Sequence, residues 1–93
     1  MRKYEVMYIL RSDLDQDAIK AEVEATKAIF TSNDSKVLDV KEWGLRELAY
    51  EIAKCTKGYY VLLNVTATVE AVNEFTRLAN IKENIIRHIV VAE

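Results

Sequence analysis

The order in which hydrophobic spacing changes along the chain constrains its fold most strongly. Four segments alternate in strand fashion or are rich in β-branched and aromatic residues, and two segments between them repeat apolar residues at helical spacing. The predicted strands cover residues 2–10, 37–52, 59–66 and 85–91, and the predicted helices cover 16–30 and 68–80. A strand-helix-strand unit that occurs twice is the ferredoxin-like split βαβ pattern. Because such crossovers are right-handed, we expect an α+β fold, with a four-stranded antiparallel sheet and two helices on one face.

Local signals mark where these segments begin and end. Asp13 or Asp15 can cap the first helix, and Thr68 can cap the second, because their side chains accept hydrogen bonds from free amides of the first turn. Gly44, inside the long second strand, suggests a bulge or a close backbone approach. Two polar stretches are expected to form loops, residues 31–35 and 53–58.

Alternation along the strands divides the predicted sheet into a helix-facing side and an open side. The helix-facing set is Tyr4, Val6, Tyr8, Leu10, Tyr59, Val61, Leu63 and Val65. The open side then carries Met7, Ile9, Tyr60 and Leu62, which are together too apolar for a face that meets only water. These four residues are predicted to bind a partner; a single bulge, which would reverse the alternation, is the alternative. The last strand is apolar on both sides, so its register and the side taken by His88 stay open.

Composition limits the classes to which the chain can belong. Ninety-three residues, 51% of them apolar and 30% charged, are enough for one modest core, so residues 1–93 are expected to form a single domain. No run of about 18 apolar residues is present, as a membrane helix would require. The opening from Arg2 to Tyr8 has no signal-peptide cleavage site. A lone Cys55 cannot form an internal disulfide, which fits a reducing cytosol.

The net charge of −2 is unusual for a protein that binds nucleic acid alone, because phosphate neutralisation supplies most of that affinity. RNA binding would need clustered cations or a basic partner, and a chain that binds no RNA is the alternative. The candidate RNA contacts are Arg2, Lys3, Arg46, Arg77, Lys82 and Arg87. Because the last strand pairs with the first in this fold, Arg2 and Lys3 could gather with Lys82 and Arg87 at one sheet edge.

The sequence lacks the motifs of common enzymes and metal sites. Its two glycines, Gly44 and Gly58, are too far apart for a phosphate-binding loop. Acylphosphatases share the fold, but their anion loop needs a glycine after the first strand, where this chain has Arg11 followed by Ser12 and an aspartate. His88 has no second histidine beside it and is expected to be partly buried and hydrogen-bonded. No enzymatic activity, metal or cofactor is therefore expected.

Lys57-Gly58-Tyr59 partly matches the RNA-recognition-motif signature on a third strand. The match ends at Tyr60, where that signature has glycine or alanine. Such modules stack bases on aromatic residues of the open sheet face, and here only Tyr60 is placed for this role. A hairpin strand that begins after a turn glycine is the simpler interpretation.

The segment from Trp43 to Ile52, taken with the opening Met1 to Val6, resembles the ribosomal protein S6 family of the bacterial small ribosomal subunit. The family pattern is a glycine, two or three basic positions and then Leu-Ala-Tyr-x-Ile. This chain matches the pattern with Gly44, Arg46, Leu48, Ala49, Tyr50 and Ile52. It departs at Leu45 and Glu47, where many members carry a basic residue. The resemblance spans residues 1–91.

The resemblance implies a structural RNA-binding protein of the cytoplasmic ribosome and no enzyme. It implies a place in the platform of the 30S subunit, bound to the central domain of 16S ribosomal RNA. It also implies a heterodimer with a small basic protein, ribosomal protein S18, and it raises Arg46 above an ordinary surface charge. The alternative is a ferredoxin-like interaction or sensor module that oligomerises through its open sheet face.

Overall fold

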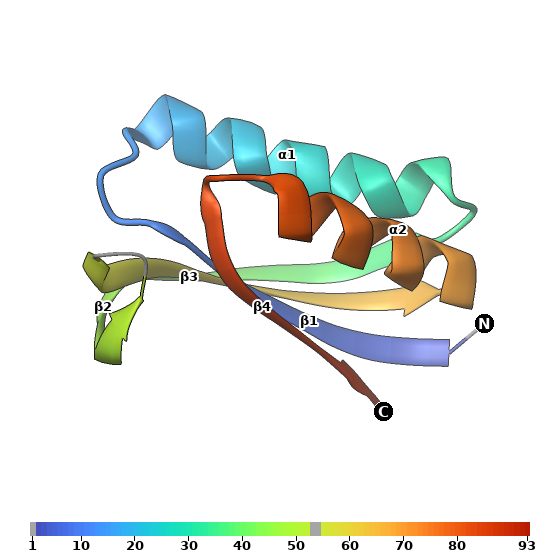
Figure 1. Cartoon of the computed structure of the whole chain (residues 1–93). Coiled ribbons are helices and arrows are strands. Elements are labelled where there is room, and N and C mark those ends of the chain that lie inside the picture. Colours follow the sequence, from blue (N-terminus) through green and yellow to red (C-terminus); the bar gives the residue numbers. More distant parts are fainter. Residues whose placement is uncertain (1, 53–54) are drawn as a thin grey trace.

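The computed structural model describes residues 2–52 and 55–93 and confirms the predicted order of elements. The elements are β1 (Arg2–Arg11), α1 (Gln16–Ser32), β2 (Lys36–Ile52), β3 (Cys55–Ala67), α2 (Val69–Ile81) and β4 (Ile85–Ala92). The strands form one antiparallel sheet in the order β2-β3-β1-β4, and both helices lie on one side of it (Figure 1). This is the predicted ferredoxin-like arrangement. In the described part of the chain, no helix is long and apolar enough to cross a membrane.

Each helix begins at a residue whose side chain caps it. Asp15 Oδ1 accepts a hydrogen bond at 2.8 Å from the amide three residues further on, and Thr68 Oγ1 does the same at 3.1 Å. Of the two predicted caps for α1, Asp15 is therefore the one used. Asp13 instead accepts a hydrogen bond from the Arg11 guanidinium, at an N···O distance of 2.8 Å.

Both predicted loops are shorter than expected. The α1 helix continues through Thr31, whose hydroxyl donates to a carbonyl of the preceding turn. Residues 55–58 belong to β3. Lys57 pairs with Glu47 of β2, and the next pair is formed by Gly58 and Arg46. Residues 53–54 of the second predicted loop lie outside the described residues. The prediction of a loop was wrong here because it took the turn glycine as the start of the strand.

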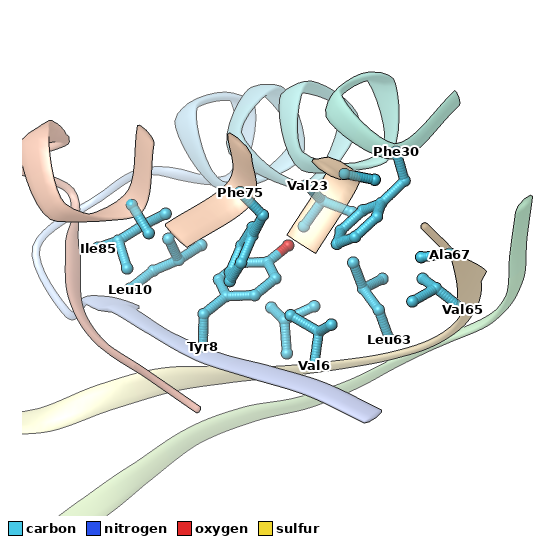
Figure 2. Packing of buried hydrophobic residues seen from close by; sticks show 13 residues of the cluster. Val6, Tyr8, Leu10, Val23, Phe30, Leu63, Val65, Ala67, Phe75 and Ile85 are labelled. Carbon is cyan, nitrogen blue, oxygen red and sulfur yellow. The ribbon is translucent and has the colours of Figure 1, made fainter. Parts of the chain in front are cut away.

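The core lies between the two helices and the inner face of the sheet (Figure 2). Val6, Tyr8 and Leu10 point from β1 toward the helices, and none of the three is exposed. Phe30 of α1 stacks on Phe75 of α2, with 5.7 Å between the ring centroids. From β3 the buried residues are Val61, Leu63 and Val65. The predicted division of the sheet into two sides is therefore correct for both central strands.

The backbone pairing of β4 gives the register that alternation alone left open. His88 lies opposite Tyr8 and therefore faces the helices. Its ring meets Phe75 edge-on at 5.7 Å, and Nε2 lies 3.0 Å from Asn80 Oδ1, so the histidine is partly buried and hydrogen-bonded, as predicted. A shift in register near the start of β4 also turns Ile85 into the core.

Replacing the buried tyrosine Tyr8 with phenylalanine should stabilise the protein. Its hydroxyl has no hydrogen-bond partner in the described part of the chain, and an unpaired buried polar group costs about 1–3 kcal/mol. We expect Tyr8→Phe to raise the free energy of unfolding by about 1 kcal/mol at neutral pH, as measured by thermal melting. A lower melting temperature for the variant would contradict this.

The same substitution should also flatten the alkaline part of the stability curve. Burial raises the pKa of the Tyr8 phenol well above its ordinary value. Above about pH 10 the unfolded chain loses this proton while the folded chain keeps it, so the stability of the parent falls as pH rises. The melting temperature of Tyr8→Phe should fall less than that of the parent between neutral pH and about pH 10.5.

Candidate functional site

The face of the sheet that the helices leave uncovered carries the four residues predicted to bind a partner. Paired residues on antiparallel strands point to the same side, so open-face residues form rows across β3, β1 and β4. One row consists of Leu62, Met7 and Ile89, and the next consists of Tyr60, Ile9 and Arg87. The structure therefore places all four on the predicted side, beside one of the predicted RNA contacts.

The end of β2 bends away from the plane of the sheet, on the side opposite the helices (Figure 1). The bend coincides with an interruption in the β2–β3 pairing between Glu47 and Ile52. Residues 48–50 then form one wall of a pocket of about 150 Å³ on the open face. The other walls are formed by Met7, Ile9, Tyr60, Arg87, His88 and Ile89.

Ile9 is buried on this face, with only 5% of its surface exposed. It lies over Gly58, where an added Cβ would come within 2.2 Å of Ile9 Cγ2 and 3.4 Å of Leu48 Cδ2. The missing side chain of Gly58 thus makes room for Ile9, and Leu48 covers the same spot. Ile9 is therefore largely buried beside the bent end of β2, and its contact with a partner stays a prediction.

Trp43 joins an arginine and a tyrosine into one stack on the open face. Its ring is nearly parallel to that of Tyr60, with 6.4 Å between centroids, and the Arg46 guanidinium lies 5.5 Å from its centre. Gly44, with a φ of +82°, adopts the left-handed conformation where the register of β2 shifts. This is the predicted bulge, and it accompanies the turn of Trp43 toward Tyr60. Trp43 remains 46% exposed.

A second arginine contacts an aromatic ring on the far side of the pocket. The Arg87 guanidinium lies 6.0 Å from the centre of the Tyr50 ring and donates a hydrogen bond to the Tyr50 hydroxyl. This contact ties β4 to the bent end of β2. Among the described residues, no group of three or more His, Cys, Asp or Glu side chains could hold a metal ion. The chemistry available on this face is therefore aromatic, cationic and apolar.

The remaining candidate RNA contacts lie elsewhere. Arg77 is exposed on α2 and pairs with a carboxylate of the preceding helical turn. The Lys82 amine lies 3.3 Å from a Glu22 carboxylate oxygen on α1. Arg2 and Lys3 begin β1, whereas Arg87 pairs with Ile9, a separation of about 20 Å along the strand. The prediction that Arg2, Lys3, Lys82 and Arg87 gather at one edge is wrong, because antiparallel pairing puts the two pairs at opposite ends of β1.

A comparison with known families identifies the chain. The family model described as Ribosomal protein S6 matches residues 3–92. The chain belongs to this family. The crystal structure of 30S ribosomal protein S6 from Thermotoga maritima, at 1.70 Å resolution, is similar throughout, with a TM-score of 0.94 and 26% sequence identity. The match covers 99% of this chain and 87% of that chain.

Family membership confirms the resemblance that rests on residues 43–52. In this member of the ribosomal protein S6 family, the segment supplies the bulge, the tryptophan–arginine contact and the wall of the pocket. Trp43 and Tyr50 lie within this motif, but neither was predicted to be a site residue. The available signal was a lone tryptophan next to a strand glycine, which marks a bulge that reorients its neighbour.

Gly58→Ala should destabilise the protein through the contact between β3 and Ile9. The added methyl group meets a β-branched side chain with little freedom to rotate, so we expect a loss of about 1–3 kcal/mol in the free energy of unfolding. Urea denaturation measures it. In an Ile9→Leu background, which lacks the clashing Cγ2 atom, the same glycine substitution should cost less. If Gly58→Ala lowers the free energy of unfolding equally in both backgrounds, the clash with Ile9 Cγ2 is not the cause.

Proposed function

We propose that this chain is a structural component of the small ribosomal subunit and binds the central domain of 16S ribosomal RNA, in the platform, together with ribosomal protein S18. Membership of the ribosomal protein S6 family supports the ribosomal role. The observation that carries the finer proposal is the open sheet face, where an apolar row lies beside two arginines. Because the family consists of structural proteins, no enzymatic reaction is proposed, and the cytoplasmic ribosome is the expected location.

The charge of the chain supports binding to RNA with a partner over binding alone. The chain carries 13 basic and 15 acidic residues. In the described part, salt bridges within the chain engage Arg11, Lys27, Lys41, Arg77 and Lys82. Because acidic residues outnumber basic ones, the chain has no surplus of positive charge for phosphate groups, whose neutralisation supplies most of the affinity of RNA binding. A small basic protein would add the missing cations.

The proposed partner surface is the apolar patch formed by Met7, Leu62, Ile89 and Val91. Ile89 and Val91 are 39% and 50% exposed, and Met7 and Leu62 are partly buried beside them. A partner that covers this patch removes apolar area from water, worth about 25 cal/mol per Å². Two of the predicted contacts are already engaged within the chain, since Tyr60 stacks on Trp43 and Ile9 is covered by the end of β2.

Arg46→Glu tests the RNA side of the proposal. The substitution should reduce co-sedimentation with small ribosomal subunits in a high-salt wash, because it reverses a charge beside the aromatic stack. Stability should fall by only about 0.5–1 kcal/mol, the worth of an exposed cation–π contact. Lys20→Glu, an equal charge change on the exposed surface of α1, is the control and should sediment like the parent. An Arg46→Glu variant that sediments normally would remove Arg46 from the interface.

Met7→Asp combined with Leu62→Asp tests the partner surface. Both positions are partly open to water in the free chain, but a docked partner would leave the new carboxylates buried and unpaired, at a cost of several kcal/mol. Co-purification with ribosomal protein S18 should therefore be lost while the melting temperature changes little. Val6→Asp is the matched control on the same strand: Val6 is fully buried, so this variant should unfold.

Two outcomes would contradict the partner surface. If the Met7 and Leu62 variant unfolds as Val6→Asp does, the patch has a structural role only. If instead the parent chain forms a dimer that the double variant abolishes, and neither associates with small subunits, a self-associating interaction module replaces the ribosomal proposal.

A further inference from the structure

We infer that the pocket between the bent end of β2 and the open face of the sheet receives the base of one unpaired RNA nucleotide. The inference rests on the proposed function and deepens it, since it names the form of RNA that this chain itself recognises and the residues that hold it. The site consists of Tyr60 and Tyr50 at the pocket, Trp43 stacked behind Tyr60, and the two arginines Arg46 and Arg87.

The size and lining of the pocket suit one flat ring. Its volume is about 150 Å³, and an apolar cavity of that size holds a single aromatic molecule. Met7, Ile9, Leu48 and Ile89 supply apolar walls, and Tyr50 and Tyr60 supply aromatic ones. Bases that are splayed out of single strands are bound in this way, stacked on aromatic side chains and arginine planes. Bases of a duplex remain stacked on one another and do not enter such a pocket.

The two arginines beside the pocket favour an anionic ligand. Arg46 and Arg87 contact aromatic rings and form no salt bridge with any described carboxylate, unlike the five basic residues that do. A cation–π contact orients a guanidinium without neutralising it, and N–H groups remain free to donate. Tyr60 on β3 and Arg87 on β4 lie on either side of Ile9 in the same row. Two strand spacings separate their backbones, which is about 10 Å. Phosphate groups on either side of an inserted base would meet these arginines.

This site lies beside the proposed partner surface and extends from it toward the end of β2. The partner surface begins at the row of Leu62, Met7 and Ile89, whereas the pocket centres on the adjacent row of Tyr60, Ile9 and Arg87. A nucleotide and a protein partner can therefore occupy the open face side by side. Met7 and Ile89 touch both regions, so occupation of one region should influence the other.

The experiment uses Trp43, the only tryptophan in the chain, as a built-in reporter. The protein is titrated at low ionic strength with a single-stranded oligoribonucleotide, with the same sequence as a duplex, and with a ribose-phosphate oligomer of equal length that lacks bases. Single-stranded RNA should change the Trp43 emission, and the duplex and the base-free oligomer should bind about tenfold more weakly. Low salt is required because phosphate contacts weaken steeply as salt rises.

Three tyrosine variants separate stacking from simple charge attraction. Tyr60→Leu should weaken single-strand binding about tenfold, within the range expected when one stacking residue is removed. Tyr60→Phe keeps the ring and should bind like the parent. Tyr59→Leu makes the same change at the adjacent residue, on the helix-facing side, and should also bind like the parent. Thermal melting establishes that each variant is folded; if Tyr60→Leu is not, Arg87→Gln takes its place and should weaken binding several-fold.

Several results would overturn the inference. Equal binding of the base-free oligomer and the intact RNA would reduce the site to phosphate attraction. If Tyr60→Leu binds single-stranded RNA as the parent does, the pocket does not hold the base. A protein partner that changes Trp43 emission by itself and displaces the oligonucleotide would assign the pocket to the partner. In each case co-sedimentation of the parent with small subunits would leave the proposed function standing, whereas loss of co-sedimentation by the parent would overturn that function.

Discussion

Ile9 lies directly over the bare backbone of Gly58, and the shape of the open face depends on that contact. Any side chain at position 58 would come within 2.2 Å of Ile9 Cγ2. Without one, Ile9 settles against β3, Leu48 covers it, and the end of β2 follows Leu48 over the face. This packing holds the end of β2 beside the open face, where residues 48–50 form one wall of the pocket.

The two faces of the sheet contribute differently to the stability of the protein. The helix-facing side buries Val6, Tyr8 and Leu10 completely, and this burial supplies the hydrophobic stabilisation on which the domain depends. The open side keeps apolar groups partly exposed and holds its two arginines against aromatic rings. Such an arrangement adds little to the stability of the free chain, since exposed cation–π contacts are worth about 0.5–1 kcal/mol. Under the proposed function, this side presents oriented charge and partly exposed apolar area to a partner.

Much of the fold followed from local patterns, because alternation and capping are local. The division of β1 and β3 into two sides and the Thr68 cap were predicted from nearby residues, whereas two alternatives stayed open for the α1 cap and for Gly44 until the structure showed Asp15 and a bulge. Alternation states on which side a residue lies but not what covers it. The burial of Ile9 depends on a bend of β2, whose residues lie about forty positions further along the chain, and no local pattern predicts it.

The errors over charge have a related cause. Lys3 and Arg87 belong to paired strands, yet the antiparallel direction of the pairing places Arg87 opposite Ile9, far along β1 from Lys3. Position on paired strands is therefore a weak guide to where charges gather. The contacts of Arg46 and Arg87 with Trp43 and Tyr50 required the bulge and the bend together. Both arginines were therefore predictable as candidate contacts, whereas the rings that hold them were not.

Under the proposed function, a net negative charge suits a protein that binds RNA at one place only. A strongly basic domain attracts any phosphate backbone, because counterion release does not depend on sequence or shape. Four of the basic residues, Arg11, Lys27, Arg77 and Lys82, form salt bridges with carboxylates on the helices or the loop before α1, which reduces their attraction for phosphate groups. The two arginines that aromatic rings hold remain unneutralised beside a pocket that admits one flat ring. Affinity would then depend on an exposed base as well as on charge, and a basic partner could add strength without removing that selectivity.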